Sequence, residues 1–278
     1  MDGILHSQKI LEDLKVRVGK LSIRPRLDII LVGDDFASQQ YVNVKEKTAQ
    51  SIGIRGVVHK FSRNATTEEI ISKVNELNKY NDVTGFMIQL PLPGHVDRDK
   101  ILDTIDWRKD VDGLTSNNLG LVFQRRSFLV PATALAVIRL LESYDMNVSG
   151  KSVVIVGAGL IAGVPLAGMF LEREATVTIC HDKTKNIQEV TGQADILVSA
   201  TGRAKLITAD WIKKGAVVVD VGIEKDPETG KTVGDVDFDS VSQKTDMISP
   251  VPGGVGPMTI ACLLENLVKI AENNETVT

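Results

Sequence analysis

The sequence predicts an α/β protein with two α/β domains, of which the second is a doubly wound sheet of parallel strands. Short apolar runs rich in β-branched residues alternate with segments of helical period along most of the 278 residues. From residue 151 onward, four apolar runs are spaced as in a nucleotide-binding sheet, and glycines follow the first run. A chain of this length is also expected to form about two domains.

Composition excludes several classes of partner. Acidic residues outnumber basic ones by 36 to 32, for a net charge of -4, so a nucleic-acid partner has little electrostatic support. No apolar run approaches the roughly 20 residues that span a bilayer, and the first residues lack the apolar core of a signal peptide. Cys180 and Cys262 have no metal-ligand spacing and are expected to be reduced core residues. We therefore expect a cytoplasmic protein with a small-molecule substrate, no membrane partner and no metal.

The first half of the chain is predicted to hold three strands that alternate with helices. In order, the patterns indicate a helix over 8–19, a strand over 27–32, a helix over 37–51, a strand around 56–58, a helix over 67–77 and a strand over 85–90. The helix at 67 has the Thr-Thr-Glu-Glu start of a capping box. Pro91 and Pro93 are expected to end the last strand, because proline cannot continue a ladder.

The segment from Asp110 to Pro131 mixes Gly, Asn and Ser with short apolar pieces and is expected to cross into the second domain. Beyond it, the patterns indicate a helix over 133–143, strands over 153–156, 175–180, 195–200 and 216–222, a surface hairpin over 224–231 and an amphipathic helix over 258–271. We expect a first domain over 1–125, a second over 126–255, and a C-terminal helix over 256–273 that packs back on the first domain.

A β-branched strand runs directly into Gly157, Gly159 and Gly163. In a dinucleotide site, the first glycine permits the tight turn, the second lets the backbone approach the phosphates, and the third lets the next helix pack close to the strand. The alternative is an ordinary strand end, where glycine pairs also occur. The following strand ends at His181 and Asp182, where a carboxylate can bind a ribose hydroxyl, and this favours a nicotinamide cofactor.

Four polar residues of the first half are candidates for a second site. Tyr41 and Lys45 lie four residues apart on a predicted helix, so both side chains project from one face. Taken alone, they could also be a half-buried tyrosine that packs in the core and a lysine whose charge is solvated. Gln89 ends a strand at the sheet edge where ligands bind. Asp112 precedes a glycine turn, and an aspartate at that position is also common in turns that bind no ligand. A Tyr-x-x-x-Lys pair occurs in short-chain dehydrogenases too, but there it lies downstream of the glycine motif, and here it lies upstream.

Four ordered motifs carry a resemblance to a known family. They are Ser38–Lys47 (SQQYVNVKEK), Gln89–Pro93 (QLPLP), Lys109–Gly113 (KDVDG) and Pro250–Thr259 (PVPGGVGPMT). With the glycine fingerprint, their order and spacing resemble the bifunctional methylenetetrahydrofolate dehydrogenase/methenyltetrahydrofolate cyclohydrolase family over nearly the whole chain. The resemblance implies a Rossmann-like second domain, a folate substrate and a homodimer.

The resemblance also implies roles for individual residues. Lys45 would be the catalytic lysine, supported by Gln89 and Tyr41. Asp112 would bind the pterin, and Tyr41 would stack on or orient the folate rings. Residues expected to form a wall beside the folate are Pro252, Gly253 and Gly254. Residues expected to bind the cofactor are Gly157, Ala158, Gly159, Ile161, Gly163, His181, Asp182, Lys183, Thr201, Gly202 and Ile223.

Two reactions follow from this resemblance. In the first, a hydride leaves the one-carbon bridge of 5,10-methylenetetrahydrofolate for a nicotinamide, and the folate nitrogens stabilise the cation, so that positioning dominates. In the second, the 5,10-methenyl form is hydrolysed to 10-formyltetrahydrofolate. Hydrolysis needs an activated water and proton transfers at the folate nitrogens, which a partly desolvated lysine can provide if its pKa falls toward neutrality.

Two departures from the family pattern bear on the cofactor. The chain has Gly-Ala-Gly at 157–159 where Gly-Arg-Ser is common, so an arginine associated with the NADP 2′-phosphate is missing. It has Asp182 where a serine is common, and a carboxylate there favours NAD. Basic residues close enough in sequence to compensate are Lys183, Lys185 and Arg203. The balance favours NADP narrowly over NAD.

Two other functions remain open at this point. The chain could be another two-domain nicotinamide dehydrogenase acting on a small hydroxy or amino acid, although no histidine stands in a recognisable motif for that chemistry. It could also be a dinucleotide sensor that has lost catalytic activity. The presence of all four candidate residues, Tyr41, Lys45, Gln89 and Asp112, argues against such a loss. Adding methylenetetrahydrofolate with NADP or NAD, and following the absorbance of the reduced cofactor, separates the three.

Overall fold

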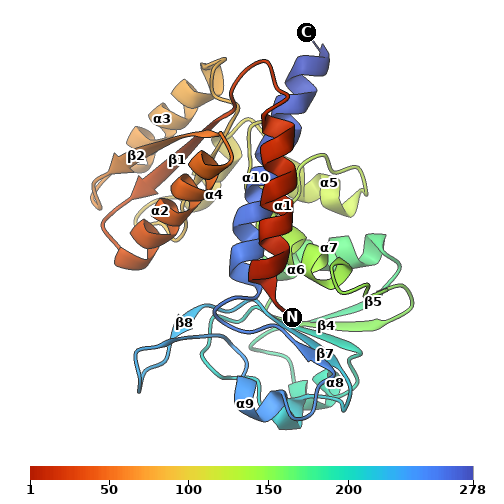
Figure 1. Cartoon of the computed structure of the whole chain (residues 1–278). Coiled ribbons are helices and arrows are strands. Elements are labelled where there is room, and N and C mark those ends of the chain that lie inside the picture. Colours follow the sequence, from red (N-terminus) through yellow and green to blue (C-terminus); the bar gives the residue numbers. More distant parts are fainter. Residues whose placement is uncertain (278) are drawn as a thin grey trace. The chain divides into compact units, whose positions relative to one another are not determined.

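Two sheets of parallel strands organise the chain, one in each of two units (Figure 1). The computed structural model describes residues 1–277. Unit 1 comprises Met1–Gln8, Val122–Arg126 and Thr133–Cys262. Unit 2 comprises Lys9–Leu121, Ser127–Ala132 and the described chain from Leu263 onward. None of the helices within the described residues is long and apolar enough to cross a membrane.

Unit 2 is built on a three-stranded sheet in the order β2-β1-β3. Its strands are β1 (Arg26–Val32), β2 (Arg55–Phe61) and β3 (Gly85–Ile88), and its helices are α2 (Phe36–Ser51), α3 (Thr67–Lys79), α4 (Arg98–Thr104) and most of α1 (Gly3–Val18) and α5 (Ser116–Phe123). The predicted capping box at α3 is present, with reciprocal bonds between Thr66 and Glu69. β3 ends two residues earlier than expected, ahead of the Pro91 and Pro93 that interrupt the ladder.

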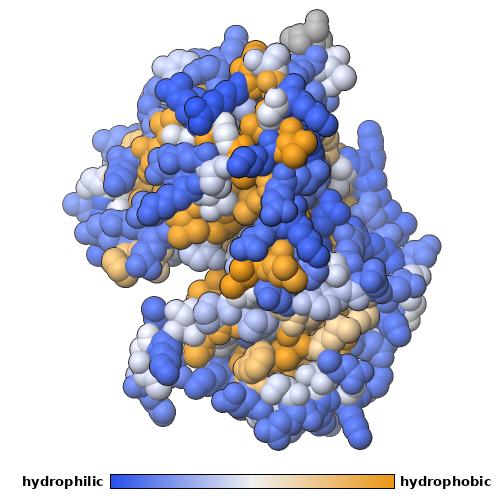
Figure 2. Space-filling view, viewed as in Figure 1, coloured by the Kyte–Doolittle hydropathy of each residue, from blue (hydrophilic) through white to orange (hydrophobic). Residues whose placement is uncertain are grey.

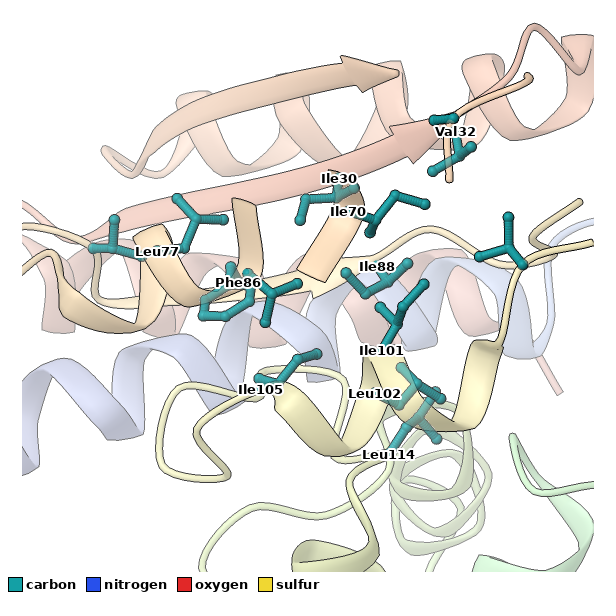
Figure 3. Close-up of a cluster of buried hydrophobic side chains, with 14 residues drawn as sticks. Ile30, Val32, Ile70, Leu77, Phe86, Ile88, Ile101, Leu102, Ile105 and Leu114 are labelled. Atoms are coloured by element: carbon teal, nitrogen blue, oxygen red, sulfur yellow. The ribbon is translucent and has the colours of Figure 1, made fainter. Parts of the chain in front are cut away.

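The core of unit 2 lies between its sheet and helices α3 and α4. Ile30 from β1 and Phe86 and Ile88 from β3 are buried there with Ile70 and Ile101 from the helices (Figure 3). Because alternate residues of a strand face opposite sides, Ile29 and Met87 point to the other face, where α2 packs. The sheet is therefore covered on both faces, as the continuous apolar strands require.

Unit 1 contains a five-stranded parallel sheet in the order β10-β7-β6-β4-β5. Its elements are α6 (Ala132–Glu142), β4 (Ser152–Val156), α7 (Gly163–Glu172), β5 (Thr176–Cys180), α8 (Ile187–Thr191), β6 (Ile196–Ser199), a 3₁₀ turn (Ala209–Trp211), β7 (Val217–Asp220), the hairpin β8 (Glu224–Lys225) and β9 (Thr232–Val233), α9 (Phe238–Val241) and β10 (Met247–Ile248). The strand after β4 lies on one side of it and the next on the other, which is the reversal of a doubly wound sheet. The predicted fold class is confirmed.

The C-terminal helix α10 (Val255–Val277) returns to unit 2, as predicted, and is longer than the sequence pattern indicated. Asn266 donates hydrogen bonds to the carbonyls of Val111 and Val130 at 2.9 and 2.8 Å. Glu272 accepts two bonds from Arg17 of α1, at 2.9 and 2.8 Å.

The face of the molecule that carries α1 mixes hydrophobic residues with a majority of hydrophilic ones (Figure 2). On α1 itself, Ile4, Leu5 and Val16 are exposed.

Candidate active site

Helix α2 carries Lys45 on its buried stripe. The helix begins after Asp35, whose carboxylate accepts the Ser38 N–H at 2.8 Å and so caps it. Its buried residues are Ser38, Val42, Lys45 and Ala49, at intervals of four, three and four. Lys45 is only 5% exposed. The sequence-based alternative of a solvated charge is therefore wrong, because this lysine lies on the face that packs against the sheet.

The ammonium of Lys45 lies among three side chains. Nζ donates to Gln89 Oε1 at 3.0 Å, lies 3.5 Å from Met87 Sδ, and is 5.6 Å from the centre of the Tyr41 ring. Met87 and Gln89 are two residues apart, so they share one face of the β3 segment. Tyr41 is one helical turn before Lys45. Three of the four candidate residues thus meet at one point through a helix and a strand end.

The amide of Gln89 is held in one orientation. Its Nε2 donates to the Leu90 carbonyl at 2.7 Å, while its backbone N–H bonds the Ile30 carbonyl at 2.8 Å. With Nε2 engaged in this way, Oε1 is the atom that faces Lys45. The strand end therefore presents an acceptor to the lysine.

Burial controls the charges at this point. Desolvation lowers the pKa of Lys45 from its ordinary value, and the nearby Asp112 carboxylate opposes that shift. Burial raises the pKa of Asp112 to about 6, against the attraction of Lys45, with Asp110 adding to the rise. Burial also raises the pKa of the Tyr41 phenol, which stays protonated near neutrality. The direction for Lys45 agrees with the expectation of a partly desolvated lysine.

The two carboxylates of the Asp-Val-Asp-Gly motif have different environments. Asp110 is 1% exposed and accepts the N–H groups of Gly113 and Thr115 at 2.9 and 2.8 Å, and the Asn118 amide at 3.0 Å. Gly113 has φ +71°, and a Cβ there would lie 2.5 Å from the Val130 backbone. Asp110 therefore builds the turn and leaves the half-buried Asp112 carboxylate available for a ligand. The aspartate that stabilises the turn is thus Asp110, a residue for which no separate prediction was made from the sequence.

The glycine loop in unit 1 fits the pyrophosphate of a dinucleotide. A Cβ on Gly157, which has φ +114°, would lie 2.1 Å from the Ala200 carbonyl, and one on Gly163 would lie 1.8 Å from the Gly157 carbonyl. Nothing lies within 4 Å of a Cβ built on Gly159. No side chain caps the N-terminus of α7 at Ala162. The Val164 N–H already bonds the Gly159 carbonyl at 3.0 Å and Pro165 has no N–H, so the Gly163 N–H and the helix dipole are what this end offers to an anion.

The other predicted cofactor residues follow neighbouring strands of the same sheet. The carboxyl ends of parallel strands share one edge, so residues after β4, β5, β6 and β7 gather there. These residues are Ala158, Ile161, His181, Asp182, Lys183, Thr201, Gly202 and Ile223. Asp182 is exposed and its Oδ2 lies 3.0 Å from Lys183 Nζ. The Lys183 N–H donates to His181 Nδ1 at 3.1 Å, which fixes the turn at the tip of β5.

The predicted folate wall lies in unit 1, whereas Tyr41, Lys45, Gln89 and Asp112 lie in unit 2. Gly253 has φ +108°, and its carbonyl accepts the Gly3 N–H at 2.8 Å. The peptide bond before Pro252 is cis. A Cβ on Gly254 would lie 2.6 Å from the Pro250 carbonyl, so a tight turn here excludes larger residues.

Comparison with known proteins decides the family. Residues 1–112 match the model of the tetrahydrofolate dehydrogenase/cyclohydrolase catalytic domain, and residues 131–275 match the NAD(P)-binding domain of that family. The chain belongs to this family. A bifunctional protein FolD from Thermodesulfovibrio yellowstonii is 45% identical over 280 residues, covering 100% of this chain and 98% of that protein.

Solved structures agree. The bifunctional FolD methylenetetrahydrofolate dehydrogenase/cyclohydrolase of Campylobacter jejuni superposes with a TM-score of 0.95 at 46% identity, covering 98% of both chains. The FolD of Trypanosoma brucei, solved with NADP and an inhibitor, gives a TM-score of 0.94 at 36% identity, covering 99% and 97%. A shikimate dehydrogenase from Thermus thermophilus, at 14% identity and a TM-score of 0.55, shares the fold alone.

Membership of the family identifies the chain as a bifunctional enzyme. It is an NAD(P)-dependent dehydrogenase of methylenetetrahydrofolate and a cyclohydrolase. The two alternatives considered from the sequence, a hydroxy-acid or amino-acid dehydrogenase and a non-catalytic sensor, are therefore wrong.

Proposed function

We propose that Lys45 transfers the protons in the cyclohydrolase reaction, that Gln89 and Tyr41 position it, and that Asp112 binds the pterin. The observation that supports this most directly is the burial of Lys45 against the Gln89 acceptor, 3.0 Å away. A buried lysine with a lowered pKa has a larger neutral fraction at physiological pH than an exposed lysine has. A neutral amine is a base that can act on water.

In hydrolysis, water adds to the bridging carbon of the methenyl form. Lys45 accepts a proton from the attacking water as the new C–O bond forms. The ammonium produced then returns this proton to the folate nitrogen as the bond from that nitrogen to the carbon breaks. The hydroxyl on the carbon loses its proton to water as the formyl C=O forms, and the formyl group stays on the other nitrogen. The Gln89 oxygen accepts a hydrogen bond from Nζ at 3.0 Å and so holds the lysine in position for both transfers.

In the dehydrogenase reaction, a bound nicotinamide would supply the acceptor for the hydride of the methylene bridge. The folate's own nitrogens stabilise the cation, so no strong base is required of the chain. The contribution of Tyr41 and Asp112 is to orient the folate, the ring by contact and the pterin edge by paired hydrogen bonds. Pro252, Gly253 and Gly254 form the wall beside it.

We propose NADP as the cofactor, narrowly ahead of NAD. The glycine loop of 157–163 would hold the pyrophosphate, and the residues that follow β5, β6 and β7 would contact the remainder. Lys183 supports NADP because its ammonium lies 3.0 Å from Asp182 and offsets that negative charge. Lys185 and Arg203 add positive charge. The FolD of T. brucei was solved with NADP, which supports NADP as the cofactor here.

We also propose that residues 1–125 and the helix over 256–273 form the folate domain, and that residues 126–255 form the cofactor domain. The bonds from Asn266 to Val111 and Val130 support this placement of the helix. The enzyme is proposed to act in the cytoplasm as a homodimer. Cys180 and Cys262 are buried and form no disulfide within the described residues, which is compatible with a reducing compartment.

The experiment that tests Lys45 uses Lys45→Met with Lys47→Met as the matched control on the same helix. Met keeps the length of the buried side chain, and Lys47 is exposed. Hydrolysis of methenyltetrahydrofolate should fall at least about 100-fold in Lys45→Met and be unchanged in Lys47→Met. Full turnover in a Lys45→Met enzyme with normal circular dichroism contradicts the proposed role.

A further inference from the structure

Two Asp and Gly pairs interlock in unit 1, outside any predicted site. Asp220 is the last residue of β7 and Gly222 lies two residues after it, whereas Gly234 and Asp235 follow the hairpin β8–β9. A Cβ on Gly222 would lie 2.2 Å from Asp235 Oδ1, and a Cβ on Gly234 would lie 1.9 Å from Asp220 Oδ2. Each glycine therefore leaves the space that the carboxylate of the other pair fills.

The Asp235 carboxylate holds the loop that follows β6. It is fully buried, and its Oδ2 accepts the Ser199 hydroxyl at 3.0 Å and the Thr201 N–H at 2.6 Å. Its Oδ1 accepts the Arg203 N–H at 3.0 Å. Three donors, one from the end of β6 and two from the loop after it, thus converge on one side chain, and the course of residues 201–203 depends on it.

The Asp220 carboxylate holds the loop that follows β7. It is 3% exposed, and its Oδ1 accepts the N–H groups of Gly222 and Asp235 at 2.9 and 3.0 Å. Its Oδ2 accepts the Val236 N–H at 2.9 Å. Asp220 therefore fixes the turn into Gly222 and ties it to the segment that carries Asp235, so the two loops are set by one network.

Both loops lie at the edge of the sheet where a dinucleotide binds. Ser199 at the end of β6 pairs in register with Asp220 at the end of β7, so the loops leave neighbouring strands side by side. We infer that Asp235 and Asp220 are positioning residues for the nicotinamide cofactor, acting by holding loops 201–203 and 221–223. The inference rests on the proposed cofactor contacts of Thr201, Gly202 and Ile223. Neither buried carboxylate is available to touch the cofactor itself.

The test is a direct binding measurement with NADP and with NAD by titration calorimetry. Asp235→Asn keeps the volume of the side chain, but whichever way the amide is turned its NH₂ faces a donor. The dissociation constant should rise about tenfold or more. Gly222→Ala should act in the same direction, because its Cβ displaces Asp235. Matched controls are Asp239→Asn, an exposed position, and Gly120→Ala, where an added Cβ meets nothing within 4 Å.

A second readout separates positioning from general loss of structure. Cyclohydrolase turnover, measured without any nicotinamide, should be unchanged in Asp235→Asn, while the dehydrogenase KM for the cofactor rises. If Asp235→Asn does not fold, Ser199→Ala decides the question, because it removes one donor and leaves the Thr201 and Arg203 bonds. Its dissociation constant should rise by roughly two- to fivefold.

Unchanged cofactor affinity in a folded Asp235→Asn or Ser199→Ala enzyme overturns the inference. A parallel loss of cofactor affinity and cyclohydrolase turnover overturns it too, since that result indicates a structural role only. If the unchanged enzyme binds neither NADP nor NAD, the proposed cofactor site itself fails, and the inference fails with it.

Discussion

Gln89 Oε1 accepts a hydrogen bond from Lys45 Nζ at 3.0 Å, and this atom is fixed there because the other end of the amide bonds the Leu90 carbonyl. The acceptor stabilises the charged form of the lysine, while burial disfavours it. The chemical nature of residue 89 should therefore set the pH at which Lys45 changes its charge.

Substitutions at Gln89 should shift the pH profile of the cyclohydrolase in opposite directions. Gln89→Glu places a negative charge beside Lys45 and raises the pKa of the lysine. The reaction rate, which should increase with pH as Lys45 becomes neutral, then increases only at higher pH. Gln89→Leu removes the acceptor and lowers the pKa of Lys45, so the rise moves to lower pH. The measurement is kcat for methenyl hydrolysis from about pH 6 to 10. Profiles that shift in the same direction, or not at all, are incompatible with a neutral-lysine mechanism.

Binding of folate should depend on the charge of Asp112. Asp112→Asn replaces one acceptor oxygen by a donor and should weaken folate binding by about 1.5 to 3 kcal/mol. In the unchanged enzyme, the pKa of Asp112 is raised to about 6 by burial, so folate affinity should fall as pH drops through that value. Asp112→Asn should lose this pH dependence. Fluorescence titration with folate at pH 5 and 8 measures both effects, and unchanged NADP affinity is the control for folding.

The same aspartate should cost stability at neutral pH. Its pKa is about 6 in the folded enzyme against an ordinary value of 3.8, so between these values the folded state keeps a proton that the unfolded chain has lost. Stability therefore falls as pH rises across that window and stays lower above it. Asp112→Asn should raise Tm at pH 8 and have little effect near pH 4. A Tm difference that does not vary with pH contradicts a buried, destabilising carboxylate.

The fold was predictable because its signals are local. The β-branched run before Gly157, the Thr66 and Glu69 cap and the proline pair after β3 each specify a boundary within a few neighbouring residues. The glycine spacing also predicted that Gly163 lets the next helix pack close to the strand, and in the structure a Cβ on Gly163 would lie 1.8 Å from the Gly157 carbonyl oxygen. Helix ends were less well defined, and α10 extends at both ends beyond its apolar pattern.

The parts that could not be predicted depend on contacts between distant residues. Lys45 is buried because its ammonium contacts Met87 and Gln89, which lie over 40 residues away in the sequence. A lysine within a helical pattern does not by itself indicate that its side chain is buried. The interlock of Asp220 with Gly234 likewise joins residues on both sides of a hairpin. In the sequence, Asp-Val-Gly at 220–222 falls at the end of the strand predicted over 216–222, and Gly-Asp at 234–235 looks like ordinary turn residues. Only the fold brings each carboxylate into the space beside the other glycine.

Cofactor choice should respond to Asp182 and Lys183 in opposite directions. Asp182 is exposed and pairs with Lys183 at 3.0 Å, so its charge is partly offset. If Asp182 faces the adenosine ribose, it repels the 2′-phosphate of NADP, and Asp182→Ser should raise the ratio of kcat/KM for NADP over NAD. Like charges about 4 Å apart cost about 1 kcal/mol in water and about 4 at an effective dielectric near 20, so a shift of roughly tenfold is expected at such a site. Lys183→Met should lower the ratio, because the remaining carboxylate loses its partner. A ratio that neither substitution changes means that the tip of β5 points away from the ribose.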